Sequence, residues 1–312
     1  MASFEESVRS LRAAAEPTRL RILAICTAGE LTVGEIGSVL AQSQPRVSRH
    51  LKLLCDVGLL LRFREGHWVY YRVPTQGRGA EQSAQLLGGI EADDNVLKLD
   101  RERAAQVREE RARLAAEELS AAADAQSRAD ESAADDELRA VLLEELGSAT
   151  LGELLDIGTG TGRILRWLAP HAREAVGVDL SSEALRVART SVHAAGLHHC
   201  MLQQADMHEL PFEARSFDVI TIDRVLANAR RPVLALKEAA RLLRAGGRLL
   251  VIEDYDRLDV ANPAAGGHAL RNLREWLTDA GFDTQRLRPL DTAGRHLLIA
   301  LCRHRASLEA AA

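Results

Sequence analysis

The chain has 312 residues, of which 46% are hydrophobic, 27% charged and 4% aromatic. This length predicts about two domains, each large enough to bury its own core, and the composition argues against a disulfide scaffold or a wholly disordered chain. The formal net charge of -5 is unevenly spread, because residues 1–75 carry +3, residues 76–150 carry -9 and the remainder carries +1. Such asymmetry indicates segments with different partners.

The cysteines Cys26, Cys55, Cys200 and Cys302 form no CxxC pair, which argues against a disulfide framework and a zinc site. His198, His199 and Cys200 are adjacent on a predicted strand, where neighbouring side chains point to opposite faces, so we expect no shared metal there. The N-terminal residues contain no apolar signal region, and no run reaches the roughly 18 apolar residues of a membrane span. We therefore expect a cytoplasmic protein with no membrane partner.

Short helices are predicted in the first part of the chain. A helix that begins near residue 4 is interrupted at Pro17, because proline is tolerated in the first turn of a new helix. A second helix begins at Thr32, which is a good N-cap. A third runs from about Pro45 to Gly58.

Two strands, residues 59–64 and 68–73, follow around a glycine turn, and together with the helices they predict a winged helix-turn-helix. The third helix presents side chains suited to phosphates and to base edges in a major groove, and the hairpin adds phosphate contacts. The predicted partner is therefore a double-stranded DNA operator. The expected DNA-binding residues are Gln44, Arg46, Ser48, Arg49, His50, Lys52, Arg62, Arg64 and His67.

The segments LRAAAEPTRLRILAIC and ELTVGEIGSVLAQSQPRVSRHLKLLCDVGLLLRFREGHWVYYRV resemble the DNA-binding core of ArsR-type bacterial repressors, most specifically in QPRVSRHLKLL. Many members of that family sense metals through cysteines in the helix before the recognition helix. This sequence has Thr32 and Gly34 where thiol ligands would be expected. The resemblance thus implies a DNA-binding repressor without that metal site.

A long helix is predicted from about Val96 to Ala123, a stretch without glycine or proline. Asp100 and Arg111 interrupt its loose heptad. Periodicity alone leaves open a solvated linker helix and a dimer helix, and the resemblance to ArsR-type repressors favours a homodimer. The apolar positions of the heptad are Leu97, Ala104, Val107, Leu114 and Ala121.

Strands and helices alternate in the last part of the chain, which predicts a parallel sheet covered by helices on both faces and a ligand beyond the carboxyl ends of its strands. The glycines of Asp156–Gly162 (DIGTGTG) let the backbone approach a ligand. A dinucleotide fingerprint would need Gly or Ala where the chain has Arg163, which weakens an NAD interpretation.

Asp179 ends the next strand, where a carboxylate can bind ribose hydroxyls, and Asp206 with Met207 follows the third strand. Each acid alone could instead cap a turn or a helix, but the conjunction favours a ligand site.

This set resembles the class I S-adenosylmethionine-dependent methyltransferases over residues 135–303. The resemblance implies a Rossmann-like domain with a mostly parallel seven-stranded sheet, a terminal hairpin that inserts an antiparallel strand, and S-adenosylmethionine or S-adenosylhomocysteine as cofactor without a metal. It implies that the glycine loop holds the methionine part, Asp179 the ribose and Asp206 with Met207 the adenine. The expected cofactor-binding residues are Asp156, Gly158, Thr159, Gly160, Gly162, Asp179, Leu180, Asp206, Met207 and Asp223.

Catalytic residues are hard to identify, because methyl transfer relies on positioning more than on covalent help from the protein. Asp223, Asp254 and Tyr255 are candidates for a base or a substrate-orienting group. They could equally pair with Arg224 or Arg257 at a loop mouth.

The expected organisation is an α/β chain with a winged helix-turn-helix domain over residues 1–78, a helical linker or dimerisation segment over 79–134 and a methyltransferase-like domain over 135–312. Two functions follow. In the favoured one, the protein is a bacterial transcriptional regulator whose cofactor shifts its DNA binding. In the other, it is an active methyltransferase that acts on a small molecule, and the helix-turn-helix domain is autoregulatory.

Overall fold

The structure is a computed structural model that describes residues 4–65, 68–75, 77–91, 94–120, 125–147, 150–261, 269–292 and 295–305. The chain divides into two compact units, Met1–Leu114 and Ala115–Ala312. Among the helices of these described ranges, none is both long enough and apolar enough to cross a membrane.

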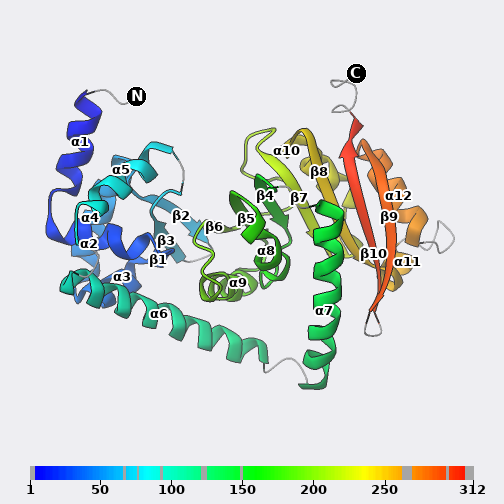
Figure 1. Cartoon of the computed structure of the whole chain (residues 1–312), viewed down its shortest axis with the longest axis horizontal. Helices are drawn as coiled ribbons and strands as arrows, with labels where there is room; N and C mark the ends of the chain where they lie inside the picture. Colours follow the sequence, from blue (N-terminus) through cyan, green and yellow to red (C-terminus); the bar gives the residue numbers. More distant parts are fainter. Residues whose placement is uncertain are drawn as a thin grey trace. The chain divides into compact units, whose positions relative to one another are not determined.

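The first unit is mainly helical (Figure 1). Its helices are α1 (Phe4–Ala14), α2 (Pro17–Cys26), α3 (Val33–Leu40), α4 (Gln44–Asp56), α5 (Gly77–Gly88) and the first part of α6 (Asn95–Ser120). Pro17 occupies the first turn of α2. Thr32 and Glu35 form a capping box at the start of α3, because each side chain accepts the backbone N–H of the other residue. The helix starts predicted at Pro17 and Thr32 are therefore confirmed.

A small antiparallel sheet completes this unit, with strands in the order β1–β3–β2. The strands are β1 (Leu31–Thr32), β2 (Leu61–Glu65) and β3 (Trp68–Arg72). The pairs between β2 and β3 run from Leu61 opposite Arg72 to Glu65 opposite Trp68, so the hairpin predicted after the third helix is present.

The first part of α6 is fastened to the helices of the first unit by buried polar contacts. The Asp100 carboxylate, only 1% exposed, accepts hydrogen bonds of 2.6 and 2.8 Å from the Arg21 guanidinium of α2. Arg108 is also buried and donates to the Ile25 carbonyl at 2.6 Å. Asp100, which interrupts the apolar heptad, therefore pairs within its own unit.

The apolar heptad positions of α6 are not equivalent. Leu97 and Ala104 are buried, whereas Leu114 is 49% exposed and Ala121 lies outside the described residues. The buried positions lie in the part of the helix that belongs to the first unit. Dimerisation through this helix stays a prediction.

The second unit is built around a seven-stranded sheet in the order β6–β5–β4–β7–β8–β10–β9 (Figure 1). The strands are β4 (Glu153–Ile157), β5 (Glu174–Asp179), β6 (Cys200–Gln204), β7 (Phe217–Asp223), β8 (Leu243–Asp254), β9 (Phe282–Thr292) and β10 (Arg295–His304). The pairs among β6, β5, β4, β7 and β8 are parallel, and β10 is antiparallel to both of its neighbours. The predicted mostly parallel sheet and its inserted antiparallel strand are confirmed.

Helices cover both faces of this sheet. One face packs against α7 (Ala125–Leu146), α8 (Arg163–Leu168) and α9 (Ser182–Ala194); the other packs against α10 (Pro232–Leu242), α11 (Tyr255–Ala261) and α12 (Ala269–Asp279). Two 3-10 turns, η1 (Ala169–His171) and η2 (Leu226–Asn228), lie between these elements. Successive residues of a strand point to opposite faces, so Leu154 joins the first core and Leu155 the second. This apolar pattern leaves the strand ends free to carry polar residues.

Candidate cofactor site and nucleic-acid surface

A cavity of about 700 Å³ lies where the parallel strands of the second unit end. One wall contains five of the predicted cofactor residues: Gly158, Asp179, Leu180, Asp206 and Met207. A second part of the lining, called the second wall, comes from the segment after β7 and the start of α10. Its residues are Val225, Asn228, Ala229, Arg230, Arg231 and Leu234.

The glycine loop after β4 has a shape that larger residues cannot adopt easily. Gly158 has a φ of 72°, and a Cβ at this position would lie 2.2 Å from Cγ2 of Val225. Its N–H donates to the Val178 carbonyl at 2.8 Å. Gly162 has a φ of 79° and begins α8. Gly158 therefore brings the loop backbone to the cavity lining and close to Val225, which a larger residue would displace.

Asp179 at the end of β5 is held in a fixed orientation. Its Oδ2 accepts the Gly160 N–H at 2.8 Å, and its Oδ1 accepts the Ser181 N–H at 2.8 Å. Ser181, not Asp179, is the N-cap of α9, because its hydroxyl accepts the Ala184 N–H. A carboxylate has about four acceptor positions, so both oxygens can still accept a hydroxyl from a ribose.

Asp156 lies beneath the glycine loop and not in the cavity lining. It is 1% exposed, and its Oδ1 accepts the Thr221 hydroxyl at 2.6 Å. Burial raises the pKa of Asp156 to about 6, because the charged carboxylate loses its contact with water. Thr159 in the loop above is also buried. The buried position of Asp156 suits a residue that stabilises the glycine loop and does not contact the ligand.

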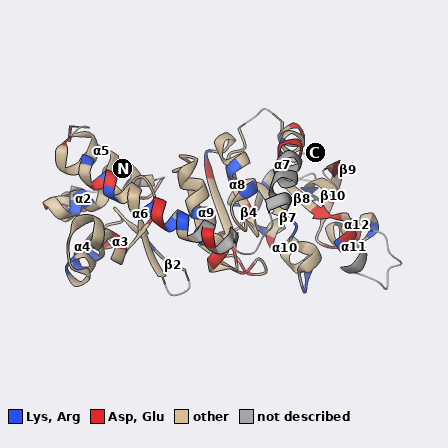
Figure 2. Ribbon diagram, turned by 90° about the horizontal axis from the view of Figure 1, so that it is seen from below, with Lys and Arg blue, Asp and Glu red and all other residues tan. Residues whose placement is uncertain are grey.

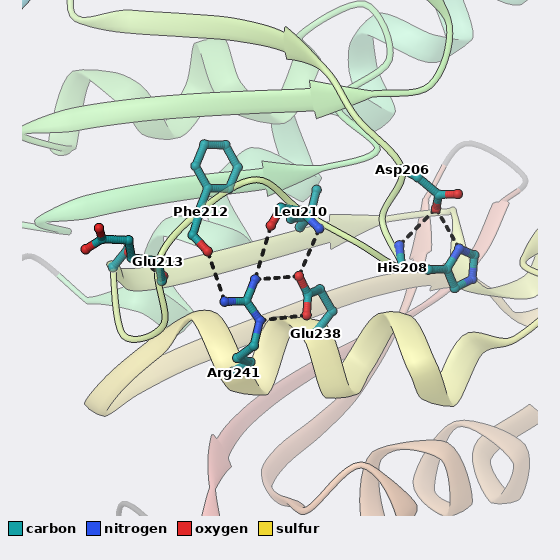
Figure 3. A network of polar contacts seen from close by, with 8 residues as sticks. Asp206, His208, Leu210, Phe212, Glu213, Glu238 and Arg241 are labelled. Carbon is teal, nitrogen blue, oxygen red and sulfur yellow. Dashed lines mark hydrogen bonds and ion pairs between the residues drawn. The ribbon is translucent and has the colours of Figure 1, made fainter.

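Asp206 stands at the turn after β6, together with Met207. Its Oδ1 accepts the backbone N–H of His208 at 2.9 Å and lies 2.7 Å from Nδ1 of the same residue (Figure 3). The backbone hydrogen bond and the imidazole contact lower the pKa of Asp206 below its usual range. Its side chain is 56% exposed, so the carboxylate is ionised and accessible at this end of the cavity.

An ion pair on α10 fastens the loop that carries Asp206 (Figure 3). The Arg241 guanidinium donates to the carbonyls of Phe212 at 2.9 Å and Leu210 at 3.1 Å, and it pairs with Glu238 at 2.6 Å. The Glu238 carboxylate also accepts the Leu210 N–H at 2.9 Å. Three hydrogen bonds therefore join the loop to α10, and the ion pair between Arg241 and Glu238 links the two side chains that make them.

Arg163, the residue that departs from the dinucleotide fingerprint, forms ion pairs with two acids. Its guanidinium donates to Asp135 of α7 and to Asp223 at the end of β7, both at 2.6 Å, and it lies 5.2 Å from the Trp167 ring centre. Arg224 lies 3.3 Å from the second oxygen of Asp223. The predicted cofactor residue Asp223 is thus engaged in ion pairs, one of which is the Arg224 pair considered as an alternative to catalysis.

The other two catalytic candidates lie apart from the main cavity. Asp254 accepts the Asp256 N–H at 3.1 Å at the start of α11. Tyr255 lines a separate cavity of about 440 Å³ with residues of α12. Among the described residues that line the main cavity, none of the three candidates is present. Within the same described ranges, no group of three or more His, Cys, Asp or Glu residues could hold a metal ion.

Glu253 is a site-supporting residue that the motifs did not single out. It is fully buried at the end of β8, and its Oε1 accepts the Leu226 N–H at 2.5 Å. Burial raises the pKa of Glu253 to about 7. Its carboxylate therefore anchors η2, which leads into the second wall of the cavity. The sequence feature that could have identified Glu253 is its position directly after the apolar run 249–252 of β8.

The polar face of α4 is accessible, and Figure 2 shows its basic positions in blue. One predicted DNA-binding residue on this helix differs from the others: His50 is 15% exposed, and its Nδ1 lies 3.6 Å from the Glu16 carboxylate. His67 lies outside the described residues. The exposed members of the predicted set are Gln44, Arg46, Ser48, Arg49, Lys52, Arg62 and Arg64.

Comparisons with known families match both units. Residues 155–251 match the model of a methyltransferase domain, and residues 14–62 match the model of a helix-turn-helix domain. The chain therefore combines a helix-turn-helix domain with a domain of the class I methyltransferase fold.

Individual relatives match parts of the chain. It is 33% identical over 102 residues to the uncharacterized methyltransferase YcgJ of Bacillus subtilis, covering 33% of this chain and 40% of that protein. It is 32% identical over 178 residues to an uncharacterized 37.1 kDa protein in transposon TN4556 of Streptomyces fradiae, covering 50% and 51%. It is 39% identical over 118 residues to the ubiquinone/menaquinone biosynthesis C-methyltransferase UbiE of Syntrophotalea carbinolica, covering 37% and 49%. The chain thus spans about half the length of these relatives, or less, and its C-terminal unit is related to methyltransferases.

Proposed function

We propose that the protein is a bacterial DNA-binding regulator of ArsR type whose methyltransferase domain binds S-adenosylmethionine or S-adenosylhomocysteine and thereby modulates DNA binding. The observation that carries this proposal is the Asp179 carboxylate, held beside the glycine loop with acceptor positions to spare, in a chain that also presents the exposed basic face of α4. The two features lie in different compact units of one polypeptide.

The residues around the main cavity fit the cofactor. Gly158 brings the backbone of the loop to the cavity lining, Asp179 offers two oxygens to the ribose, and Asp206 offers an exposed carboxylate to the adenine amine. Leu180 is 68% exposed at the cavity and supplies an apolar surface for a base. When bound, S-adenosylmethionine supplies a methyl group on a sulfonium that is already a good leaving group.

On the DNA side, we propose that α4 enters the major groove and that the β2–β3 hairpin acts as the wing. Arg46, Arg49 and Lys52 would contact phosphates or base edges, and Arg62 and Arg64 would contact phosphates. A homodimer would present two such faces to an operator with two half-sites. We propose the division 1–78, 79–134 and 135–312 for the DNA-binding, linker or dimerisation, and cofactor segments, and a cytoplasmic location.

Modulation requires that the cofactor favour one DNA-binding conformation over another, because a ligand with equal affinity for both shifts nothing. Couplings of this kind are typically about 5- to 150-fold. A gel-shift titration on the protein's own promoter, with and without a saturating amount of each cofactor form, tests the proposal. We expect the dissociation constant for DNA to change at least about five-fold with one form. A dissociation constant for DNA that is the same with and without the cofactor would contradict the proposal that the cofactor modulates DNA binding.

The second wall of the cavity favours a second candidate function. Arg230, Arg231 and Leu234 line the cavity but have no part in the cofactor contacts above, so they are available to a second ligand. In this candidate, the protein is an active methyltransferase that acts on a small molecule, and its helix-turn-helix domain is autoregulatory. The test is formation of S-adenosylhomocysteine from S-adenosylmethionine in the presence of small-molecule extracts. Turnover that is lost in an Asp179 variant supports the methyltransferase function. If the wild-type protein shows no turnover, the regulator that senses the cofactor is the function that stands.

A further inference from the structure

The second wall of the main cavity carries positive charge. Arg230 and Arg231 both line the cavity and are exposed, and they lie between η2 and Pro232, the first residue of α10. The acids that line the same cavity have contacts of their own, because backbone N–H groups donate to Asp179 and His208 contacts Asp206. Among the described contacts, neither of these carboxylates forms an ion pair with Arg230 or Arg231.

Other cations near this wall are matched by acids. Arg224 lies 3.3 Å from Asp223, and Arg241 lies 2.6 Å from Glu238 on the same helix that follows the pair. Within the described part of the chain, Arg230 and Arg231 have no such ion pair, and the first turn of α10 contains no acidic side chain. The two guanidinium groups are thus not held in ion pairs within the described residues and can bind a ligand anion.

An apolar surface lies next to the two arginines. Leu234 lines the cavity and is 42% exposed, although leucine is usually buried. Leu234 lies in the first turn of α10 and the two arginines lie directly before this helix, and all three line the same cavity. Val225 and Ala229 continue the apolar lining. The wall therefore offers a contact surface for carbon atoms and, beside it, donors for an anion.

We propose that this cavity binds, beside the cofactor, a small molecule with an apolar body and a carboxylate or phosphate group, and that Arg230 and Arg231 bind the anionic group. The planar guanidinium offers paired N–H donors whose spacing matches two oxygens of a carboxylate or phosphate. The inference rests on the proposed cofactor binding. In the catalytic candidate function, this small molecule is the methyl acceptor.

The experiment uses the full-length protein with and without saturating S-adenosylhomocysteine. Benzoate and phenyl phosphate are titrated as anionic probes, and benzamide and benzyl alcohol serve as neutral probes of similar size, with binding followed by ligand-observed NMR at constant ionic strength. We expect the anions to bind at least about ten-fold more tightly than their neutral counterparts, because only they accept charge-assisted hydrogen bonds.

Variants assign the effect to the two arginines. The double variant Arg230→Gln/Arg231→Gln should lower benzoate affinity about ten-fold and leave benzamide affinity unchanged. Lys237→Gln is the control, because Lys237 is an exposed cation of α10 outside the cavity lining. Both variants should unfold at the wild-type temperature, since they change exposed side chains.

The outcomes separate the inference from the proposed function. Equal affinity for benzoate and benzamide overturns the inference, whether or not S-adenosylhomocysteine binds. Failure of the wild-type protein to bind S-adenosylhomocysteine by calorimetry overturns the proposed function instead. If the double variant loses S-adenosylhomocysteine affinity as strongly as benzoate affinity, the arginines hold the cofactor and the inference is wrong.

Discussion

Asp179 and Gly160 are joined by a hydrogen bond of 2.8 Å from the Gly160 N–H to Oδ2 of Asp179. This bond connects the end of β5 to the glycine loop that follows β4. Because the Ser181 N–H holds the other carboxylate oxygen, the orientation of the carboxylate is set before any ligand arrives. A ligand that uses these oxygens therefore does not bear the cost of ordering them.

Replacing Asp179 should remove cofactor binding. Asp179→Ala deletes two acceptors for ribose hydroxyls, and each charge-assisted hydrogen bond contributes about 1.5–3 kcal/mol, so we expect at least about a 100-fold loss of S-adenosylhomocysteine affinity by calorimetry. Asp136→Ala is the control, since Asp136 is exposed on α7 and outside the cavity lining. An unchanged affinity of Asp179→Ala for S-adenosylhomocysteine would contradict the assignment of Asp179 to the ribose.

Two glycines of the loop should respond differently to alanine. Gly158→Ala places a Cβ 2.2 Å from Val225, whereas Gly160→Ala meets no atom within 4 Å, although both have positive φ. We expect Gly160→Ala to cost about 1 kcal/mol of stability and Gly158→Ala more, with loss of cofactor affinity. Adding Val225→Ala should restore part of the Gly158→Ala loss. Equal losses in both single variants would contradict a steric role for Val225.

Arg163 should be a large contributor to the stability of the second unit. Arg163→Gln leaves Asp135 and Asp223 without their shared cation, and Arg163 and Asp223 are only 14% and 10% exposed. Loss of one partner of such a pair costs about 3 kcal/mol. A Trp68→Phe background leaves Trp167 and Trp276 as reporters in urea denaturation. The control Arg173→Gln removes a cation that is 65% exposed and should cost about 0.5 kcal/mol; a similar cost for both would refute the role of burial.

Glu253 should make the stability of the second unit depend on pH. Its folded-state pKa of about 7 lies above the ordinary 4.5, so its contribution to stability is complete below about pH 4.5 and is lost as the pH rises through 7. Glu253→Gln is neutral throughout and can keep the acceptor for Leu226. The variant should therefore gain about 2 kcal/mol relative to wild type between pH 5 and pH 8 in urea denaturation. A pH-independent difference would contradict a raised pKa, and Glu213→Gln, which replaces an exposed acid, is the control variant.

Arg49 and His50 should contribute unequally to DNA binding. Arg49 is exposed on α4, whereas His50 contacts Glu16 and is 15% exposed. We expect Arg49→Ala to weaken operator binding about ten-fold by fluorescence anisotropy and to leave cofactor affinity intact, because the two sites lie in different units. His50→Ala should have a smaller effect. Loss of cofactor affinity in Arg49→Ala would argue against modular domains.

Local chemistry was enough to predict many elements of the fold. Proline in the first turn of α2 and the capping pair of Thr32 and Glu35 act within a few residues of one another. The glycine loop and Asp179 were predictable as well, because parallel strands bring their carboxyl ends to one edge. To predict these features, it is enough to know where each strand ends and the order of the elements along the chain.

Contacts between distant residues could not be derived in this way. The heptad predicted Asp100 as an interruption of a seam, but its partner Arg21 comes from a helix 79 positions earlier. Asp223 was expected to serve the cofactor, and it is Arg163, 60 positions away, that binds its carboxylate. The sequence alone determined the elements and the residues at the strand ends. Tertiary structure decided which carboxylates are neutralised and which arginines face the cavity, because charge pairing depends on distances in space that no local pattern encodes.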